Sequence, residues 1–541
     1  MKKIKLKTKN IIRLLSALTF IVILIFIITK SVENLSKDLQ IYYIAGNTDK
    51  VDIYDLELNK KNALYRGTSI VKIKDKTIND TLYTEIIYEN EKYYIKNENL
   101  QENIENIIYE DKLYVRTPVT VYQNNKDNTI LGYIEKGNSV DIIGYSGINN
   151  GIVSMYKIAY QNKEGYIYSK YLVETKEGAD KLYPVEGLGN YTKLMDYYPY
   201  EKGNFKDNIM PEEVRAIYLN GSVLDNIDSY IELANNSEIN AFVIDIKENT
   251  YPLYKSKVME KYSITSYNKA SKSIEYIKNI LDKLKQNNIY AIARIVVGKD
   301  TFYGQDNPND LITYKNGNPY IHNSSTWVSM YSRRVWEYNV SLAKEAVDLG
   351  FNEIQFDYLR FPDSSNTNLD FKNTYNESEK AVAIQNFLFY AVDEIHKKHA
   401  YVSADVFGEC AHGYITGYGQ YFAAISNVVD VISAMPYPEL FASYEYGIKY
   451  PWNEPYNTLK SWGNYVVKQQ SIIKSPAIVR TWIQAYTASW RSNYINYTNK
   501  EIEDEIRALY DLGFRQGFIA WNGGSSLNTY KSYIKAFNGE Y

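Results

Sequence analysis

Several classes of protein are excluded by what this sequence lacks. Cys410 is the single cysteine among 541 residues, so no disulfide can form within the chain. Lysine and arginine together number 61 and aspartate and glutamate 64, so the chain has no basic excess of the kind that nucleic-acid-binding proteins carry. Export remains compatible with this composition, because a large domain can be stable without disulfides.

Motifs for several enzyme classes are also missing. No Gly-x-Ser-x-Gly sequence marks a nucleophilic serine. Of the four histidines, His396 and His399 lie at the end of a predicted helix, which leaves only His322 and His412 as further histidine ligands for zinc. We therefore predict no metal and no other cofactor, and a metal-dependent deacetylase is disfavoured.

The N-terminal residues predict a membrane anchor. Five lysines and Arg13 accompany an uncharged, mostly apolar run over residues 14–29, and with Ile11 and Ile12 the segment approaches the ~20 residues that a bilayer core requires. A cleaved signal peptide is the alternative, but no small-x-small cleavage pattern follows Thr29. We expect a cytoplasmic tail and transmembrane helix over 1–30, a stalk over 31–40, and the rest of the chain outside the cell membrane.

Two β-rich segments, 41–105 and 110–176, have the character of repeats. Tyr88 and Tyr160 lie in similar stretches at an offset of 72 residues, and both segments combine period-2 alternation with turn residues. The second segment ends in EGYIYSKYL and resembles bacterial SH3-like domains, and the first resembles them less closely. This resemblance implies either binding of cell-wall glycan or peptide, or a spacer role.

From residue 200 to residue 541, short apolar runs alternate with amphipathic helical stretches. This alternation predicts a parallel sheet, and eight such units match a (β/α)8 barrel. An open doubly wound sheet is the alternative, but it usually carries a Gly-rich phosphate loop after its first strand, and none is present. The predicted strands cover residues 214–220, 241–247, 289–297, 353–361, 402–408, 429–437, 478–484 and 516–522.

Polar and aromatic residues gather at the predicted carboxyl ends of these strands, where barrel active sites lie. A charged residue in an apolar strand is costly to bury unless it is paired or functional. Asp245 is the one most easily explained as a structural partner, of Lys247 or Arg294. The candidate site residues are Asp245, Lys247, Arg294, Asp357, Arg360, Asp405, Tyr437, Trp482, Gln484, Trp521 and Asn522.

Two of these carboxylates form the predicted catalytic pair. Glycosidic hydrolysis needs an acid and a nucleophile or base on either side of one bond. Asp357 is the expected nucleophile, with Arg360 as a nearby cation, and Asp405 is the expected acid because apolar neighbours would raise its pKa. Asp245 and Glu409 are the alternatives if either side chain faces away from the barrel mouth. The aromatic residues are expected to contact sugar rings or to pack in the core, and the amides to bind sugar hydroxyls.

Four motifs stand in order along the barrel segment: NAFVIDIK at 240–247, GFNEIQFDYLRFP at 350–362, VSADVFG at 402–408 and DVISAMPYP at 430–438. Together they resemble the family of barrel proteins described as putative glycosyl hydrolases. The resemblance implies the barrel fold and a glycoside hydrolase acting on envelope or extracellular polysaccharide. The alternative from another functional class is a non-catalytic wall-binding or scaffold protein whose barrel reads glycans.

Overall fold

The computed structural model describes residues 40–45, 50–104, 112–149, 152–180, 195–364, 367–377 and 379–541. The predicted transmembrane helix and nearly all of the predicted stalk lie outside these residues. Within the described ranges, no helix is both long enough and apolar enough to span a bilayer.

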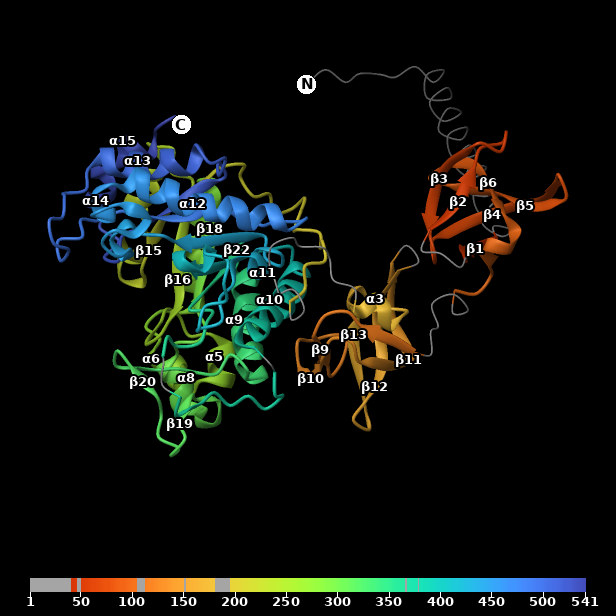
Figure 1. The fold of residues 1–541 in the computed structure, drawn as a ribbon, viewed down its shortest axis with the longest axis horizontal. Helices are drawn as coiled ribbons and strands as arrows, with labels where there is room; N and C mark the ends of the chain where they lie inside the picture. Colours follow the sequence, from red (N-terminus) through yellow and green to blue (C-terminus); the bar gives the residue numbers. More distant parts are fainter. Residues whose placement is uncertain are drawn as a thin grey trace, which may run out of the picture. The chain divides into compact units, whose positions relative to one another are not determined.

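Two seven-stranded antiparallel sheets form the N-terminal region and have the same connectivity (Figure 1). The first has the strand order β3-β2-β6-β5-β4-β1-β7 and the second β10-β9-β13-β12-β11-β8-β14. Each strand of the first sheet therefore corresponds to the strand numbered seven higher in the second sheet. The offset of 72 residues recurs between β6 (Glu91–Lys96) and β13 (Lys163–Tyr168), which agrees with the predicted repeat. The other strands are β1 (Gln40–Ile44), β2 (Lys50–Tyr54), β3 (Lys60–Tyr65), β4 (Ser69–Ile78), β5 (Thr81–Tyr88), β7 (Leu100–Gln101), β8 (Lys112–Val115), β9 (Val119–Tyr122), β10 (Ile130–Ile134), β11 (Ser139–Asn149), β12 (Ile152–Tyr160) and β14 (Leu172–Val173).

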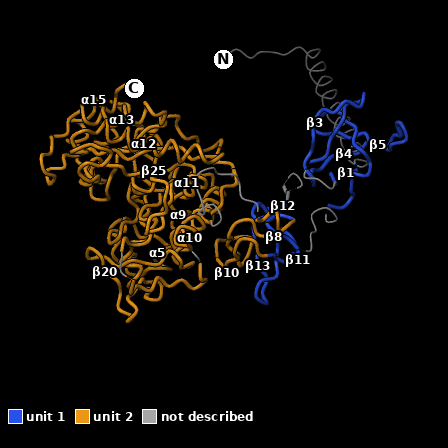
Figure 2. Tube along the Cα trace, viewed as in Figure 1, with its two compact units in different colours: residues 1–113, 139–174 blue, residues 114–138, 175–541 orange. Residues whose placement is uncertain are grey.

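The chain divides into two compact units, coloured separately in Figure 2. One comprises residues 1–113 and 139–174, and the other residues 114–138 and 175–541. The second unit therefore includes the β9–β10 hairpin. Asn128 in this hairpin donates hydrogen bonds to Ser341 Oγ (3.0 Å) and to the Tyr390 hydroxyl (2.9 Å), which lie on the barrel helices α9 (Arg333–Leu349) and α10 (Lys380–His396).

A parallel α/β barrel forms the core of the second unit, as the strand–helix alternation predicts. Its path runs β26-β25-β24-β22-β18-β16-β15-β28-β27, and β26 and β27 are separated only by Arg480, so the barrel is nearly closed and the open-sheet alternative is wrong. The strands are β15 (Val214–Leu219), β16 (Ala241–Glu248), β18 (Tyr290–Val296), β22 (Glu353–Asp357), β24 (Tyr401–Phe407), β25 (Val431–Met435), β26 (Ile478–Val479), β27 (Thr481–Gln484) and β28 (Gly517–Trp521). The main intervening helices are α4 (Ile227–Asn235), α7 (Ile274–Gln286), α9, α10, α11 (Phe422–Ser426), α12 (Pro455–Ile472) and α13 (Asn499–Tyr510).

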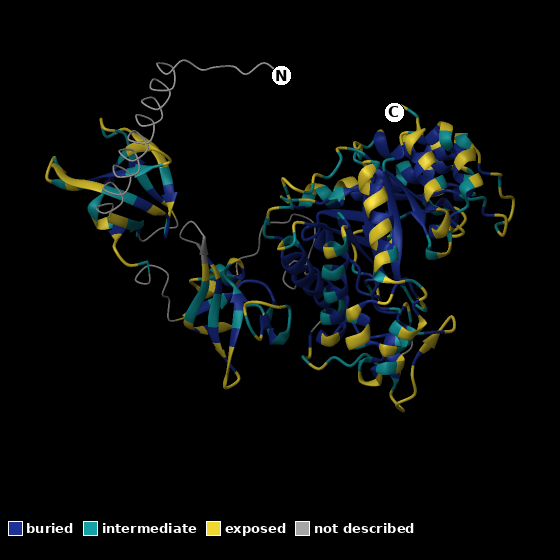
Figure 3. Cartoon of the chain, turned by 180° about the vertical axis from the view of Figure 1, so that it is seen from behind, coloured by how far each residue is buried: buried dark blue, intermediate teal, exposed yellow. Residues whose placement is uncertain are grey.

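The barrel strands are buried on both faces, which explains their continuous apolar runs (Figure 3). Alternate residues such as Val214, Ala216 and Tyr218 belong to the interior core. The fourth strand was predicted to extend to residue 361 but ends at Asp357, because Tyr358 has a left-handed φ of 49° that turns the chain out of the sheet.

Candidate active site

Four adjacent strands bring one polar side chain each to the same end of the barrel. These side chains are Tyr218 on β15, Asp245 on β16, Arg294 on β18 and Asp357 on β22. Asp245 and Arg294 are direct register partners across their two strands. The positions lie at or near the carboxyl ends of the strands, where barrel enzymes build their active sites.

Arg294 joins two of these carboxylates. Its Nη1 lies 2.6 Å from Asp245 Oδ1, and its Nη2 and Nε lie 2.5 and 3.0 Å from Asp357 Oδ2. Tyr218 donates its hydroxyl hydrogen to the other oxygen of Asp245. All four residues are buried, and one guanidinium between two carboxylates leaves the cluster one negative charge in excess.

Asp405 on β24 lies deeper in the same cluster. Its Oδ2 is 3.9 Å from Arg294 Nε and has no hydrogen-bond partner among the described residues, while its Oδ1 accepts a 2.8 Å hydrogen bond from Trp482 Nε1. Burial, followed by the nearby charge of Asp357, raises the pKa of Asp405 well above its ordinary value. This shift favours the protonated form of Asp405, whose side chain is fully enclosed.

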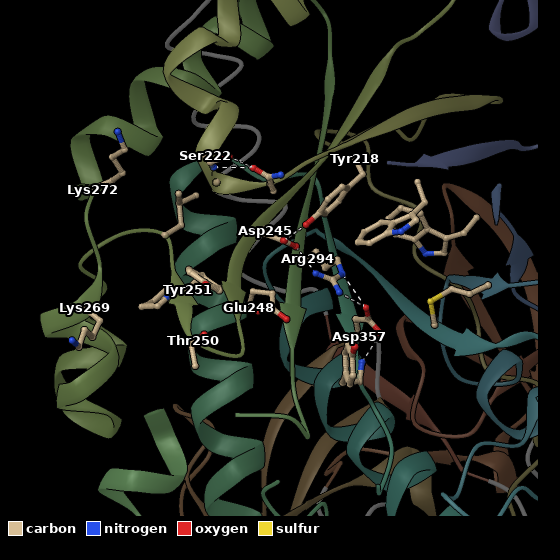
Figure 4. A pocket seen from close by; sticks show the side chains of 18 of the residues that line it. Tyr218, Ser222, Asp245, Glu248, Thr250, Tyr251, Lys269, Lys272, Arg294 and Asp357 are labelled. Carbon is tan, nitrogen blue, oxygen red and sulfur yellow. Dashed lines mark hydrogen bonds and ion pairs between the residues drawn. The ribbon is translucent and has the colours of Figure 1, made fainter. Parts of the chain in front are cut away.

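A cavity of ≈ 910 Å³ opens above Asp357 and Arg294. Its size is that of a small-molecule or oligosaccharide site. Figure 4 shows that Asp245, Glu248, Arg294 and Asp357 approach one another from neighbouring strands in this cavity. Aromatic side chains form part of its wall, namely Tyr218, Tyr358, Phe407, Tyr437, Trp482 and Trp521.

The opposite end of the cavity is formed by the segments that follow β15 and β16. Ser222, Thr250, Tyr251, Lys269 and Lys272 line it, and Figure 4 shows them far from Asp357. Lys272 forms an ion pair with Asp225 at 2.6 Å. The cavity is therefore elongated, with the carboxylate cluster at one end and hydroxyl and ammonium groups at the other.

Four predicted site residues do not line this cavity. Lys247 is buried in a 2.6 Å ion pair with Asp300, and not with Asp245. Gln484 donates to the Tyr486 carbonyl and Asn522 to the Ala485 carbonyl, so both amides organise loop backbone. Asp405 is the fourth, enclosed beneath the cavity. The other seven predicted residues line it together: Asp245, Arg294, Asp357, Arg360, Tyr437, Trp482 and Trp521.

Arg294 is the cation in direct contact with Asp357, whereas Arg360, the cation expected from the sequence, lines the same cavity without forming an ion pair with Asp357 among the described residues. Tyr358 turns the chain, so Arg360 leaves the strand and its guanidinium is surrounded by aromatic rings at 4.6–5.5 Å. It donates to the Phe361 carbonyl, and no carboxylate lies within ion-pair distance of it among the described residues. The rings belong to Trp327, Tyr358, Phe407 and Tyr418.

Tyr218 and Glu248 are among the cavity residues that sequence reasoning missed. Glu248 extends into the cavity from the last position of β16, and its carboxylate has no hydrogen bond or ion pair among the described residues (Figure 4). The sequence contained a pattern that could have identified both residues. Tyr218 shares the inward face of β15 with Ala216, and Glu248 directly follows the strand end at Lys247.

Three of the solved structures that the chain resembles are the following. The PgaB (BpsB) glycoside hydrolase domain from Bordetella bronchiseptica is 10% identical over 60% of this chain and 99% of its own, with a TM-score of 0.44. The C-terminal domain of a putative chitinase from Desulfitobacterium hafniense is 12% identical over 60% and 98%, with a TM-score of 0.40. A hypothetical protein from Ruminiclostridium thermocellum is 33% identical over 35% and 97%, with a TM-score of 0.31.

No curated protein matches the chain in sequence. The family model described as "putative glycosyl hydrolase domain" matches residues 216–527, which is more than half of the chain and includes every barrel strand except the first two residues of β15. The chain therefore belongs to this glycosyl hydrolase domain family.

Proposed function

We propose that this protein is a glycoside hydrolase that cleaves a cell-envelope or extracellular polysaccharide, with Asp357 as its nucleophile. The observation that carries the proposal is the position of Asp357, which lies at the carboxyl end of β22, in the cavity and in contact with Arg294. The contact with Arg294 fixes the orientation of the Asp357 side chain, and a carboxylate oxygen in the cavity is the group that a retaining glycosidase uses to attack an anomeric carbon.

The proton donor must reach the leaving-group oxygen directly or through one water. The pKa of Asp405 is raised by burial, but its enclosure favours a positioning role, in which it accepts a hydrogen bond from Trp482 and borders Arg294. Glu409 is outside the cavity and accepts a 2.5 Å hydrogen bond from Tyr418. Glu248 faces the cavity without a partner among the described residues, so we assign the donor role to Glu248.

One observation favours the alternative, a glycan-binding barrel without catalysis. Both oxygens of Asp357 are engaged, Oδ2 by Arg294 and Oδ1 by the Tyr358 backbone N–H at 2.5 Å. A carboxylate held in this way can orient a sugar without attacking it. The N-terminal modules suit either function, since they would hold the chain at wall glycan or peptide while the anchor holds it at the membrane.

The test is release of reducing ends from purified cell-wall and exopolysaccharide fractions by the full-length protein. A hydrolase generates new reducing ends in at least one fraction, in proportion to enzyme and time. Retention of the protein on these fractions, with no reducing ends released from any of them, would support the glycan-binding alternative instead.

A further inference from the structure

The seven tryptophans of the chain fall into three environments. Trp521 is half-buried in the wall of the cavity. Trp490 is 64% exposed on the loop after β27, outside the cavity. The other five are at most 3% exposed, namely Trp327, Trp336, Trp452, Trp462 and Trp482. Exposing the apolar surface of an indole to water is unfavourable. The contacts that hold Trp490 therefore show whether this exposed position is fixed by the structure.

Trp490 is fixed in place. Its Nε1 donates to Glu439 Oε2 at 3.3 Å, and its ring stacks on Tyr486 with centroids 5.8 Å apart and planes 21° apart. Tyr486 donates to the other oxygen of Glu439 at 3.1 Å, and Arg491 Nε donates to the Glu439 carbonyl at 2.6 Å. Glu439 itself is buried. The open face of the indole is therefore preorganised, and binding to it costs little side-chain entropy.

The aromatic contacts continue from Trp490 into the cavity. The ring centroid of Tyr486 lies 6.3 Å from that of Tyr437, in an edge-to-face arrangement. Tyr437 lines the cavity, as does Trp482. The rings of Tyr437, Tyr486 and Trp490 thus form a continuous line from the wall of the cavity to the exposed loop.

We infer that Trp490 is an outer subsite for the glycan that occupies the cavity. The apolar face of a sugar ring stacks on the open face of the indole, and the same glycan chain continues past Tyr437 into the cavity. The inference rests on the proposed function and makes it more specific, since a subsite outside the cavity serves a polymer and contributes nothing to a disaccharide. Aromatic surfaces with polar tips suit ligands that present both C–H and O–H groups.

Oxidation by N-bromosuccinimide, mapped by peptide mass spectrometry, tests this assignment on the full-length protein. Oxidation at Trp521 reports occupancy of the cavity, and oxidation at Trp490 reports occupancy of the outer subsite. The probes are glycol chitin, hydroxyethyl cellulose, xylan, glucomannan and polygalacturonate, with chitobiose and cellobiose as short ligands. We expect at least one polymer to protect both tryptophans and its disaccharide to protect Trp521 at most.

Substitution supplies an independent measurement. On the polymer that protects both residues, Trp490→Ala should weaken affinity roughly three- to tenfold, the scale of one aromatic contact. Trp490→Phe should restore most of it. Tyr494→Ala is the matched control, because Tyr494 is 44% exposed on the same loop and has no contact with Tyr486 or Glu439 among the described residues.

Two results would overturn the inference. One is a polymer that protects Trp521 and leaves Trp490 as reactive as in buffer. The other is that no polymer in the panel protects Trp490. Protection of both residues without release of reducing ends would keep the outer subsite and refute hydrolysis, so the failure of the inference and the failure of the proposed function are distinguishable.

Discussion

Arg294 and Asp357 form a buried ion pair at one end of the cavity, with Arg294 Nη2 and Nε at 2.5 and 3.0 Å from one carboxylate oxygen. The same guanidinium holds Asp245 at 2.6 Å and borders Asp405 at 3.9 Å. Three carboxyl groups from three strands therefore depend on one cation, which makes Arg294 the organising residue of the site.

Replacing Arg294 should destabilise the fold strongly. Arg294→Gln leaves Asp245 and Asp357 buried without their counter-charge, and breaking a buried ion pair in this way costs about 3–5 kcal/mol. The free energy of unfolding in urea measures the effect. Lys283→Gln is the control, because the Lys283–Asp228 pair is exposed and such pairs are worth at most about 1 kcal/mol. Equal stability losses in the two variants would contradict this account of the cluster.

Asp405 should make the stability of the protein depend on pH. Its pKa is raised in the folded state, so its contribution is full below the unfolded pKa of about 3.9 and is lost as pH rises towards the folded value. Asp405→Asn keeps an acceptor for Trp482 but cannot ionise. The variant should therefore gain stability relative to the wild type by up to about 1.4 kcal/mol for each pH unit above that point. A difference between the two proteins that stays constant from pH 4 to pH 8 would show that Asp405 titrates normally.

The hydrolysis rates of two variants can show whether Glu248 or Asp405 is the proton donor. Glu248→Gln removes a proton donor that faces the cavity, and loss of general acid catalysis costs on the order of a hundredfold to ten-thousandfold. Asp405→Asn should cost less, because the Asp405 side chain is enclosed and asparagine retains an acceptor for the Trp482 hydrogen bond. The comparison uses kcat and its alkaline pH limb on the polysaccharide that the wild type degrades. A larger loss in Asp405→Asn would assign the proton donor to Asp405, as the sequence predicts.

The N-terminal segment predicts an N-in, C-out topology. Protease added to intact cells should then remove the barrel, while the tail before residue 14 stays protected. A cytoplasmic marker protein is the control for cell integrity. A barrel that survives in intact cells and is digested after lysis would be inconsistent with this topology.

The fold was more predictable than the site. Continuous apolar runs specify buried parallel strands, and alternation along a strand tells which residues share a face, so the barrel and seven of its cavity residues follow from the pattern. Contacts between side chains on neighbouring strands depend on the tilt of the strands and on how deep each side chain lies in the barrel, and a sequence shows neither. Arg294, and not Arg360, forms the ion pair with Asp357, because Tyr358 has a left-handed φ and ends the strand before Arg360. Asp405 shares the barrel interior with Asp357 but is fully buried and does not line the cavity.

The most direct test of the central claim compares the wild type with Asp357→Asn in the reducing-end assay. The account predicts that the wild type releases reducing ends and that Asp357→Asn is slower by on the order of a thousandfold or more, since it lacks the nucleophile. The variant should keep wild-type secondary structure and cavity binding, which far-ultraviolet circular dichroism and protection of Trp521 report. Near-normal turnover by a correctly folded Asp357→Asn protein would contradict the claim.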